Sequence, residues 1–258
     1  METRKIINYI TGWLDAYSVS SGTKGFVVGI SGGIDSAVTS ALCAMTGKRV
    51  IAVNMPIRQD PEQIERSRAH ISWLQTHYQN VEAAETDLST ILKAFEEALP
   101  AEIQDQLAMA NTRARIRMSA LYAYASHHQM LVAGTGNKIE DFGIGFFTKY
   151  GDGGVDLSPI ADLTKTEVYA LATELEVIQS IRTAAPTDGL FGESRTDEDQ
   201  IGASYPELEW AMDYEERSDK EVLTERQEKV LAIYQSRNRA NRHKMEPIPV
   251  CTLPKELK

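Results

Sequence analysis

One short segment carries most of the structural information in this chain: Phe26-Val-Val-Gly-Ile30, followed directly by Ser31-Gly-Gly-Ile-Asp-Ser36. Its first five residues have the apolar, β-branched composition of a buried strand. The glycines then permit a tight turn, after which apolar residues from Ile34 to Met45 recur at helical spacing. A second buried strand, Val50-Ile-Ala-Val-Asn54, follows. Strand, turn, helix and strand within about 30 residues predict a βαβ unit and therefore a parallel sheet.

The alternation of strands and helices continues along the chain. Residues 61–79 and 104–128 have the apolar spacing of helices, whereas Val81-Glu-Ala-Ala-Glu-Thr86 and Met130-Leu-Val-Ala-Gly134 have the pattern of strands. The run Thr164-Lys-Thr-Glu167 predicts a capping box that opens a further helix. We therefore expect an α/β chain with a Rossmann-like three-layer fold and a mainly parallel sheet.

Two segments outside this alternation have distinctive patterns. Residues from about 2 to 20 form a predicted helix with one apolar face, which suits either core packing or a subunit interface. Residues 187–228 are strongly acidic. Within them, residues 189–204 are rich in Gly, Ser, Asp and Glu and lack periodicity, so we expect a mobile acidic loop there.

The composition excludes several classes of protein. Of 258 residues, 42% are hydrophobic and 25% are charged, which argues against wholesale disorder. The net charge of −10 argues against a protein that coats DNA or RNA, which needs a basic face. The longest apolar runs are too short to span a bilayer, and Cys43 and Cys251 have neither a disulfide framework nor zinc-ligand spacing. We expect one cytoplasmic domain over residues 1–258, with no nucleic-acid or membrane partner.

The glycine turn between strand and helix is typical of a phosphate-binding loop. Its backbone N–H groups converge on an anion, and the helix N-terminus adds a partial positive charge. The loop has no lysine, so it is not a Walker A motif. Asp35 would repel a phosphate unless a cation lay between them, which predicts a Mg²⁺ ligand. The alternative is a tight turn in which Asp35 caps the helix.

The run Ser31-Gly-Gly-Ile-Asp-Ser36 resembles the pyrophosphate-binding loop of the N-type ATP pyrophosphatases, whose fold is adenine nucleotide alpha hydrolase-like. Within that superfamily, five further segments of this chain resemble NAD synthetases: Asn111-Thr-Arg-Ala-Arg-Ile-Arg117, Gly134-Thr-Gly-Asn-Lys-Ile-Glu140, Gly145-Phe-Phe-Thr-Lys-Tyr-Gly-Asp-Gly-Gly-Val-Asp156, Pro159-Ile-Ala-Asp-Leu-Thr-Lys165 and His243-Lys244. The resemblance covers almost the whole chain.

The resemblance implies a ligase reaction. ATP activates the carboxylate of deamido-NAD as an acyl-adenylate, and ammonia then gives NAD, AMP and pyrophosphate. It also implies Mg²⁺ as the metal and a homodimer whose dinucleotide site spans the interface. Glutamine-dependent members carry an additional glutaminase domain, for which 258 residues leave no room, so we expect free ammonia as the nitrogen source.

The same resemblance implies roles for individual residues. The expected ATP contacts are Gly29, Ile30, Ser31, Gly32, Gly33, Ile34, Asp35, Ser36, Thr135, Lys165 and Thr187. The expected deamido-NAD contacts are Arg115, Lys149, Asp156, His243 and Lys244, and the expected Mg²⁺ ligands are Asp35 and Glu140. The expected catalytic residues are Asp35, Lys149, Asp152 and Lys165.

Strand positions support part of this assignment independently. Thr135 follows a predicted strand at its carboxyl end, where ligands bind in open α/β sheets, and Glu140 lies five residues further on. Three arginines of the 104–128 helix cannot all face one way. We select Arg115 for the substrate and expect Arg113 and Arg117 on a solvated face. The acidic 189–204 loop is a candidate lid over the adenylate.

Two alternatives remain open at this point. One is another ATP pyrophosphatase, such as a GMP-synthetase-like or tRNA-modifying enzyme, although a tRNA enzyme needs a larger basic surface than this chain offers. The other is a nucleotide-binding module without catalysis. Against the second stands the complete set of Asp35, Glu140 and Lys165, because a sensor needs no second metal carboxylate.

Overall fold

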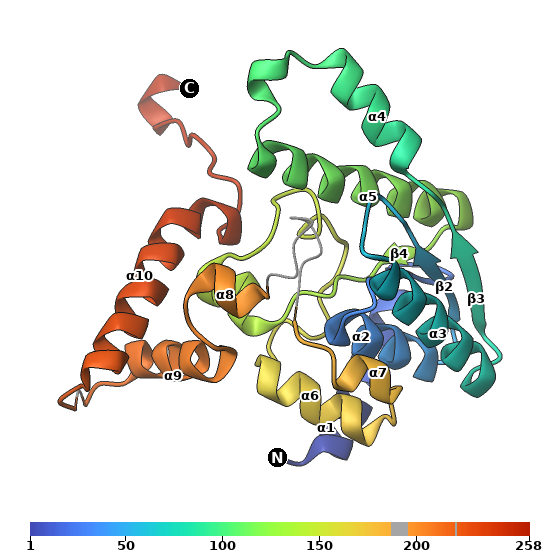
Figure 1. Cartoon of the computed structure of the whole chain (residues 1–258), viewed down its shortest axis with the longest axis horizontal. Coiled ribbons are helices and arrows are strands. Elements are labelled where there is room, and N and C mark those ends of the chain that lie inside the picture. Colours follow the sequence, from blue (N-terminus) through green and yellow to red (C-terminus); the bar gives the residue numbers. More distant parts are fainter. Residues whose placement is uncertain (187–195, 220) are drawn as a thin grey trace.

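A four-stranded parallel sheet in the order β3–β2–β1–β4 forms the centre of the molecule (Figure 1). The computed structural model describes residues 1–186, 196–219 and 221–258. The strands are β1 (Gly25–Gly29), β2 (Arg49–Asn54), β3 (Val81–Glu85) and β4 (Leu131–Val132). The predicted parallel sheet is confirmed, and the glycine turn leaves the carboxyl end of a central strand.

Helices cover both faces of the sheet. The helices of the first half of the chain are α1 (Thr3–Ser20), α2 (Ile34–Met45), α3 (Pro61–His77), α4 (Ser89–Ala98) and α5 (Gln106–His128). One buried cluster joins α1, α2, α3 and the later α6 (Lys165–Glu174) to side chains such as Phe26 and Val28. A second joins α4 and α5 to the alternate side chains Val27 and Ile51. Because successive strand residues face opposite sides, these clusters make the expected three layers.

A third group of helices packs beside the sheet rather than on it. It comprises a π-helix (Ile139–Ile144), α8 (Asp197–Ile201), α9 (Tyr205–Glu216) and α10 (Glu225–Met245). Their shared core includes Ile139, Leu208 and Val230. Figure 1 shows α9 and α10 at one side of the molecule, away from β2 and β3. The remaining short helices are the four-residue α7 (Gln179–Arg182) and the 3₁₀ turns Ala101–Ile103 and Lys255–Leu257.

The structure differs from the sequence-based prediction in the acidic segment. Residues 189–195 of the predicted 189–204 loop lie outside the described residues, and the expected lid role therefore stays a prediction. The expected lack of regular structure is wrong for α8, which a reciprocal capping box of Thr196 and Asp199 opens. Gly202 ends this helix with a φ of 89°. Three consecutive acidic residues, Asp197 to Asp199, show no apolar periodicity, so this short capped helix was not predicted.

The N-terminal helix is apolar on more than one side. Ile7 and Leu14 are fully buried against the sheet layer, whereas Tyr9 and Trp13 keep 76% and 39% of their surfaces exposed. The described part of the chain contains no helix long and apolar enough to cross a membrane.

Candidate active site

A cavity of about 780 Å³ lies where the glycine turn, α5, the 145–155 loop, α6 and the end of α10 meet. Its lining includes most of the residues selected from the sequence: Gly29, Ile30, Ser31, Gly32, Gly33, Ile34, Asp35, Ser36, Arg115, Thr135, Glu140, Lys149, Asp152, Lys165, His243 and Lys244. Thr187 lies outside the described residues. Segments more than 200 residues apart in sequence therefore contribute to one concave surface, as expected for a ligand site.

The glycine turn is held in shape by its own serines. The Ser31 backbone N–H donates to Ser36 Oγ at 3.2 Å, the Gly33 N–H donates to Ser31 Oγ at 3.2 Å, and Ser36 Oγ donates to the Gly33 carbonyl at 3.0 Å. Gly33 is the N-cap of α2 and no side chain caps it. The alternative in which Asp35 caps the helix is therefore wrong. The uncapped helix end leaves N–H groups available to an anion.

Gly32 is required at its position for two reasons. Its φ is +81°, in the left-handed region that favours glycine. A Cβ there would also lie 2.6 Å from the carbonyl oxygen of Gln63 in α3. The close approach of α3 to the turn thus depends on the missing side chain.

Lys165 joins the two predicted metal carboxylates. Its Nζ lies 2.6 Å from Asp35 Oδ2 and 3.0 Å from Glu140 Oε1, and the three side chains are only 5–16% exposed. Burial acts to lower the pKa of the Lys165 ammonium, but attraction to the two carboxylates outweighs it and holds that pKa above its ordinary value. Asp35 and Glu140 therefore converge on one point, as the sequence predicts, and a cation occupies it.

Two residues that the sequence reasoning missed orient these carboxylates. Asn137, which is fully buried, donates from Nδ2 to Asp35 Oδ1 at 3.2 Å and accepts the Glu140 N–H at 3.2 Å. Tyr205 donates its hydroxyl to Glu140 Oε1 at 2.5 Å, and its ring lies 4.7 Å from Lys165 Nζ. The signal for Asn137 was its place two residues before the π-helix, where a side-chain amide oxygen can accept the first N–H groups of a helix. Tyr205 had the pattern of an ordinary core aromatic.

The predicted dinucleotide contacts form a chain of hydrogen bonds around the 145–155 loop. Lys149 Nζ donates to the carbonyl of His243 at 2.5 Å, and Lys244 Nζ donates to the carbonyl of Phe147 at 2.7 Å. Arg115 donates from Nε to the Lys149 carbonyl at 3.3 Å. These three cations line the cavity while their donors hold the loop against α10, so they are placed to bind an anion and to position the loop.

Two predicted aspartates, one in this loop and one directly after it, differ in whether they line the cavity. Asp152 lines the cavity, and its Oδ1 accepts the Thr148 N–H at 3.0 Å. Asp156 does not line it. Instead its carboxylate accepts the Val132 N–H at 2.8 Å and the Tyr122 hydroxyl at 3.0 Å, which ties β4 to α5. The contact of Asp156 with substrate stays a prediction that the cavity geometry does not support.

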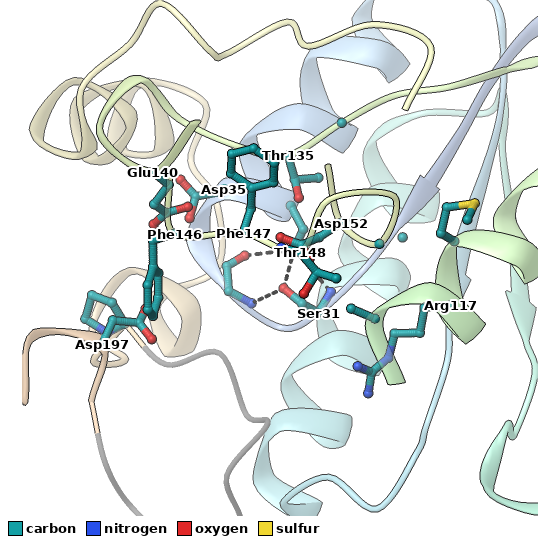
Figure 2. Close-up of a pocket in the computed structure, with 18 of the residues that line it drawn as sticks. Ser31, Asp35, Arg117, Thr135, Glu140, Phe146, Phe147, Thr148, Asp152 and Asp197 are labelled. Carbon is teal, nitrogen blue, oxygen red and sulfur yellow. Dashed lines mark hydrogen bonds between the residues drawn. The ribbon is translucent and has the colours of Figure 1, made fainter. Parts of the chain in front are cut away.

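The expectation that Arg117 lies on a solvated face is wrong. Arg117 lines the cavity, its Nε donates to the carbonyl of Met55 at 3.3 Å, and its terminal nitrogen Nη2 is buried. Figure 2 shows Arg117 on one side of the cavity, with Asp35 and Glu140 on the other and Ser31 between them. A polar residue that faces a cavity has the same sequence pattern as one that faces solvent, which is why the helical spacing misled.

Comparison with known proteins gives consistent results. A sequence model of the family described as NAD synthase matches residues 6–248. The NH(3)-dependent NAD(+) synthetase of Methanosarcina mazei is 40% identical over 214 residues, which make up 81% of each protein.

Two solved structures share the fold over nearly their full length. The NMN synthetase from Francisella tularensis matches with a TM-score of 0.86 and 29% identity, covering 99% of both chains. The NH3-dependent NAD synthetase from Campylobacter jejuni matches with a TM-score of 0.80 and 28% identity, covering 98% of this chain and 100% of that one.

Proposed function

The chain belongs to the NAD synthase family, and from this premise we propose how its cavity carries out the ATP-dependent amidation of deamido-NAD by ammonia. This reaction is that of a ligase which forms a carbon–nitrogen bond. The observation that carries the proposal is the meeting of Asp35, Glu140 and Lys165 beside the glycine turn. That arrangement unites an anion-binding loop with the charges that a departing pyrophosphate requires.

The chemistry explains why such a site is needed. A carboxylate is a poor acyl donor because its leaving group would be oxide. An oxygen of the deamido-NAD carboxylate attacks the α-phosphorus of ATP, the bond to the β-phosphate oxygen breaks, and pyrophosphate leaves. Ammonia then attacks the acyl carbon of the adenylate, AMP leaves, and one proton is released. The protein positions the reactants and stabilises charge rather than forming covalent bonds to them.

The glycine turn and Lys165 receive the ATP phosphates in this proposal. Backbone N–H groups of residues 31–36 and the uncapped N-terminus of α2 surround the pyrophosphate. Lys165 is held as a cation by its two carboxylates and stabilises the negative charge that develops on the leaving group. Thr135, at the same edge of the sheet, contacts the nucleotide.

A Mg²⁺ ion fits the same place. Oxygens of Asp35 and Glu140 lie within 3.0 Å of one cationic atom, so the two carboxylates can share a divalent cation as they share Lys165. In the described part of the chain no cluster of three or more metal-binding side chains exists. Two carboxylates suffice for Mg²⁺, which keeps water and substrate phosphate oxygens as its other ligands. Bound there, it would neutralise phosphate charge.

The dinucleotide binds against the 145–155 loop and the end of α10. Arg115, Lys149 and Lys244 supply positive charge for its phosphates and carboxylate, and His243 adds a hydrogen-bonding side chain. Asp152 lies at the same wall and accepts the proton that ammonia loses on attack.

We further propose a homodimer in the cytoplasm that uses free ammonia. The exposed aromatic side chains Tyr9, Trp13 and Tyr17 of α1 supply an apolar surface that a second copy would cover. A dimer in which the partner completes the dinucleotide site follows from the family resemblance. A cytoplasmic location matches the supply of ATP and dinucleotide.

One assay tests the function directly. The purified protein is incubated with ATP, MgCl₂, an ammonium salt and deamido-NAD, and NAD and AMP are quantified. Equal amounts of NAD and AMP, abolished by Asp35→Asn, are the expected result. AMP formation with xanthosine monophosphate or tRNA but no NAD would instead indicate another ATP pyrophosphatase. ATP binding without turnover would indicate a binding module.

One observation favours a second candidate substrate. The NMN synthetase structure matches this chain more closely than the NAD synthetase structure does. The corresponding reaction amidates nicotinic acid mononucleotide, which carries the same carboxylate as deamido-NAD but lacks its AMP half. Parallel measurements of kcat/KM on the mononucleotide and on deamido-NAD would distinguish the two, and a higher value for the mononucleotide would replace the first candidate by the second.

A further inference from the structure

Arg117 is a partly buried cation that forms no ion pair among the described residues, although the charge of Asp152 acts on it at longer range. Within the described part of the chain its one hydrogen bond is from Nε to the backbone carbonyl of Met55, at 3.3 Å. Its Nη2 is buried and has no hydrogen-bond partner among the described residues. Burial and the neighbouring charge of Arg113 lower the pKa of Arg117 to about 10, so the guanidinium is still charged at neutral pH. A charged group with a buried nitrogen that no carboxylate pairs is costly, and such groups cluster at functional sites.

The position of Arg117 separates it from the other cations of the cavity. Arg115 and Arg117 are two residues apart on α5 and so point in different directions. Arg115 donates to the loop carbonyl of Lys149, toward the proposed dinucleotide half. Arg117 donates to Met55, one residue beyond the carboxyl end of β2. Figure 2 places it across the cavity from Asp35 and Glu140.

The wall beside Arg117 suits a nucleoside. A Cβ on Gly29 would lie 3.1 Å from the Met55 methyl carbon and 3.3 Å from a Leu121 methyl carbon, so two apolar side chains border the end of β1. If the pyrophosphate of a nucleotide lies in the Ser31–Ser36 turn, this apolar wall is a surface against which its nucleoside can pack. Its α-phosphate then lies between the turn and the wall, on the side from which Arg117 enters the cavity.

We propose that Arg117 is a substrate-binding residue for the α-phosphate of ATP, where it stabilises the phosphoryl group under attack and the AMP that leaves later. This inference rests on the proposed function, since it takes ATP to be the nucleotide at the glycine turn. A guanidinium suits the role because its planar fork pairs with two phosphate oxygens at once. No bond to Arg117 forms or breaks in the reaction.

Binding of separate fragments of ATP tests the assignment without turnover. Isothermal titration calorimetry would measure the affinities of ATP, AMP, adenosine and pyrophosphate for the wild-type chain, for Arg117→Gln and for Arg117→Lys. We expect Arg117→Gln to weaken ATP and AMP about 10- to 100-fold, the range for loss of a hydrogen bond between charged groups. Adenosine and pyrophosphate should keep their wild-type affinities, and Arg117→Lys should fall between. Arg113→Gln is the matched control, because Arg113 is on the same helix but does not line the cavity.

The melting temperature provides a second test, because it should change in opposite directions if Arg117 is a binding residue and if Arg117 stabilises the fold. Removal of a buried unpaired charge should raise the Tm of the ligand-free Arg117→Gln variant, whereas removal of a structural arginine would lower it. Unchanged AMP affinity, an equal loss for adenosine, or a raised KM for deamido-NAD with normal ATP binding would each overturn the proposal. If the wild-type chain binds ATP and AMP but makes no NAD, the proposed function fails while this assignment can still be judged.

Discussion

The ammonium nitrogen of Lys165 lies 2.6 Å from Oδ2 of Asp35, although 130 residues separate the two in sequence. Asp35 is in the first turn of α2 and Lys165 is the first residue of α6, so two helix N-termini approach each other here. The positive ends of both helices favour the carboxylates of Asp35 and Glu140 and disfavour the lysine. The attraction of two carboxylates nevertheless holds the lysine there as a cation. The negative charge of the ligand-free site is therefore partly neutralised by a cation of the chain itself.

Removal of that cation should destabilise the chain. We expect Lys165→Met to lower the free energy of unfolding by about 3–5 kcal/mol, because it leaves two buried carboxylates facing each other. MgCl₂ should restore part of the lost stability, because Mg²⁺ can then bind between the two carboxylates in place of the ammonium. Thermal unfolding with MgCl₂, and with NaCl of equal ionic strength, measures both effects.

The control is Lys138→Met, which removes a surface ion pair with Asp162, a residue that is 98% exposed. That change should alter stability by at most about 1 kcal/mol. If Lys165→Met gains no more from MgCl₂ than the wild-type chain does, Asp35 and Glu140 are not a magnesium site.

Gly32 should be intolerant of even a methyl group. In Gly32→Ala the residue keeps a positive φ at a cost of about 1–2 kcal/mol, and its Cβ must also move away from the Gln63 carbonyl. We expect a distorted turn, with the KM for ATP raised about 10-fold or more. Gly47→Ala is the matched control, because Gly47 has a similar φ of +73° and nothing within 4 Å of its Cβ position. Equal effects of both changes on ATP would show that close packing at Gly32 is irrelevant.

The fold was predictable where local patterns determine it. The segment from β1 to β2 alternates cleanly between strand and helix periodicity, and its glycines mark the turn. α10 could not be found in the same way, since Val230 and Tyr234 are its only residues classed as buried over 21 described positions. Its contacts are instead made by polar side chains such as Asn238 and Asn241, which donate to the carbonyls of Gly143 and Ile144.

The candidate site was predictable only in part, for a related reason. Ser31–Ser36 is a local motif and its shape follows from its own residues. The contact of Lys165 with Asp35 depends on how two distant helices pack, and it was not predicted: the family resemblance only assigned both residues to the ATP site. Arg117 was placed wrongly because hydropathy does not distinguish a wet cavity from bulk solvent.

The hydrogen bond from Lys244 to the Phe147 carbonyl should matter for the dinucleotide and little for ATP. Lys244→Gln removes a charged donor at the join of α10 and the 145–155 loop. We expect the KM for deamido-NAD to rise about 10- to 100-fold, with the KM for ATP within a factor of about 3 of wild type. Steady-state kinetics with each substrate varied in turn gives both values. Lys229→Gln, an exposed position on the same helix, is the control. A larger effect on ATP would reverse the proposed division of the cavity.

His70 should make the stability of the chain depend on pH below neutrality. The imidazole of His70 in α3 is fully buried and stacks on Trp73, and its Nε2 lies 3.0 Å from Ser40 Oγ. Ser40 donates its own proton to the Ala37 carbonyl, so Nε2 carries the hydrogen and donates to Ser40. Nδ1 is buried without a partner among the described residues. A second proton would therefore be placed on an isolated buried nitrogen, and burial lowers the pKa of His70 from 6.5 to about 4.

The direction of the pH effect follows from this lowered pKa. Above pH 6.5 the imidazole is neutral in both folded and unfolded chains, and the stability is fully present. Between pH 6.5 and about 4 the unfolded chain binds a proton that the folded chain does not, so stability falls as the pH falls. A shift of this size corresponds to a loss of roughly 3 kcal/mol. Urea unfolding at a series of pH values should show this slope in the wild-type chain and a smaller one in His70→Gln. His77→Gln, an exposed position of α3, should leave the slope unchanged, and an unchanged slope in His70→Gln would mean that folding does not shift the pKa of His70.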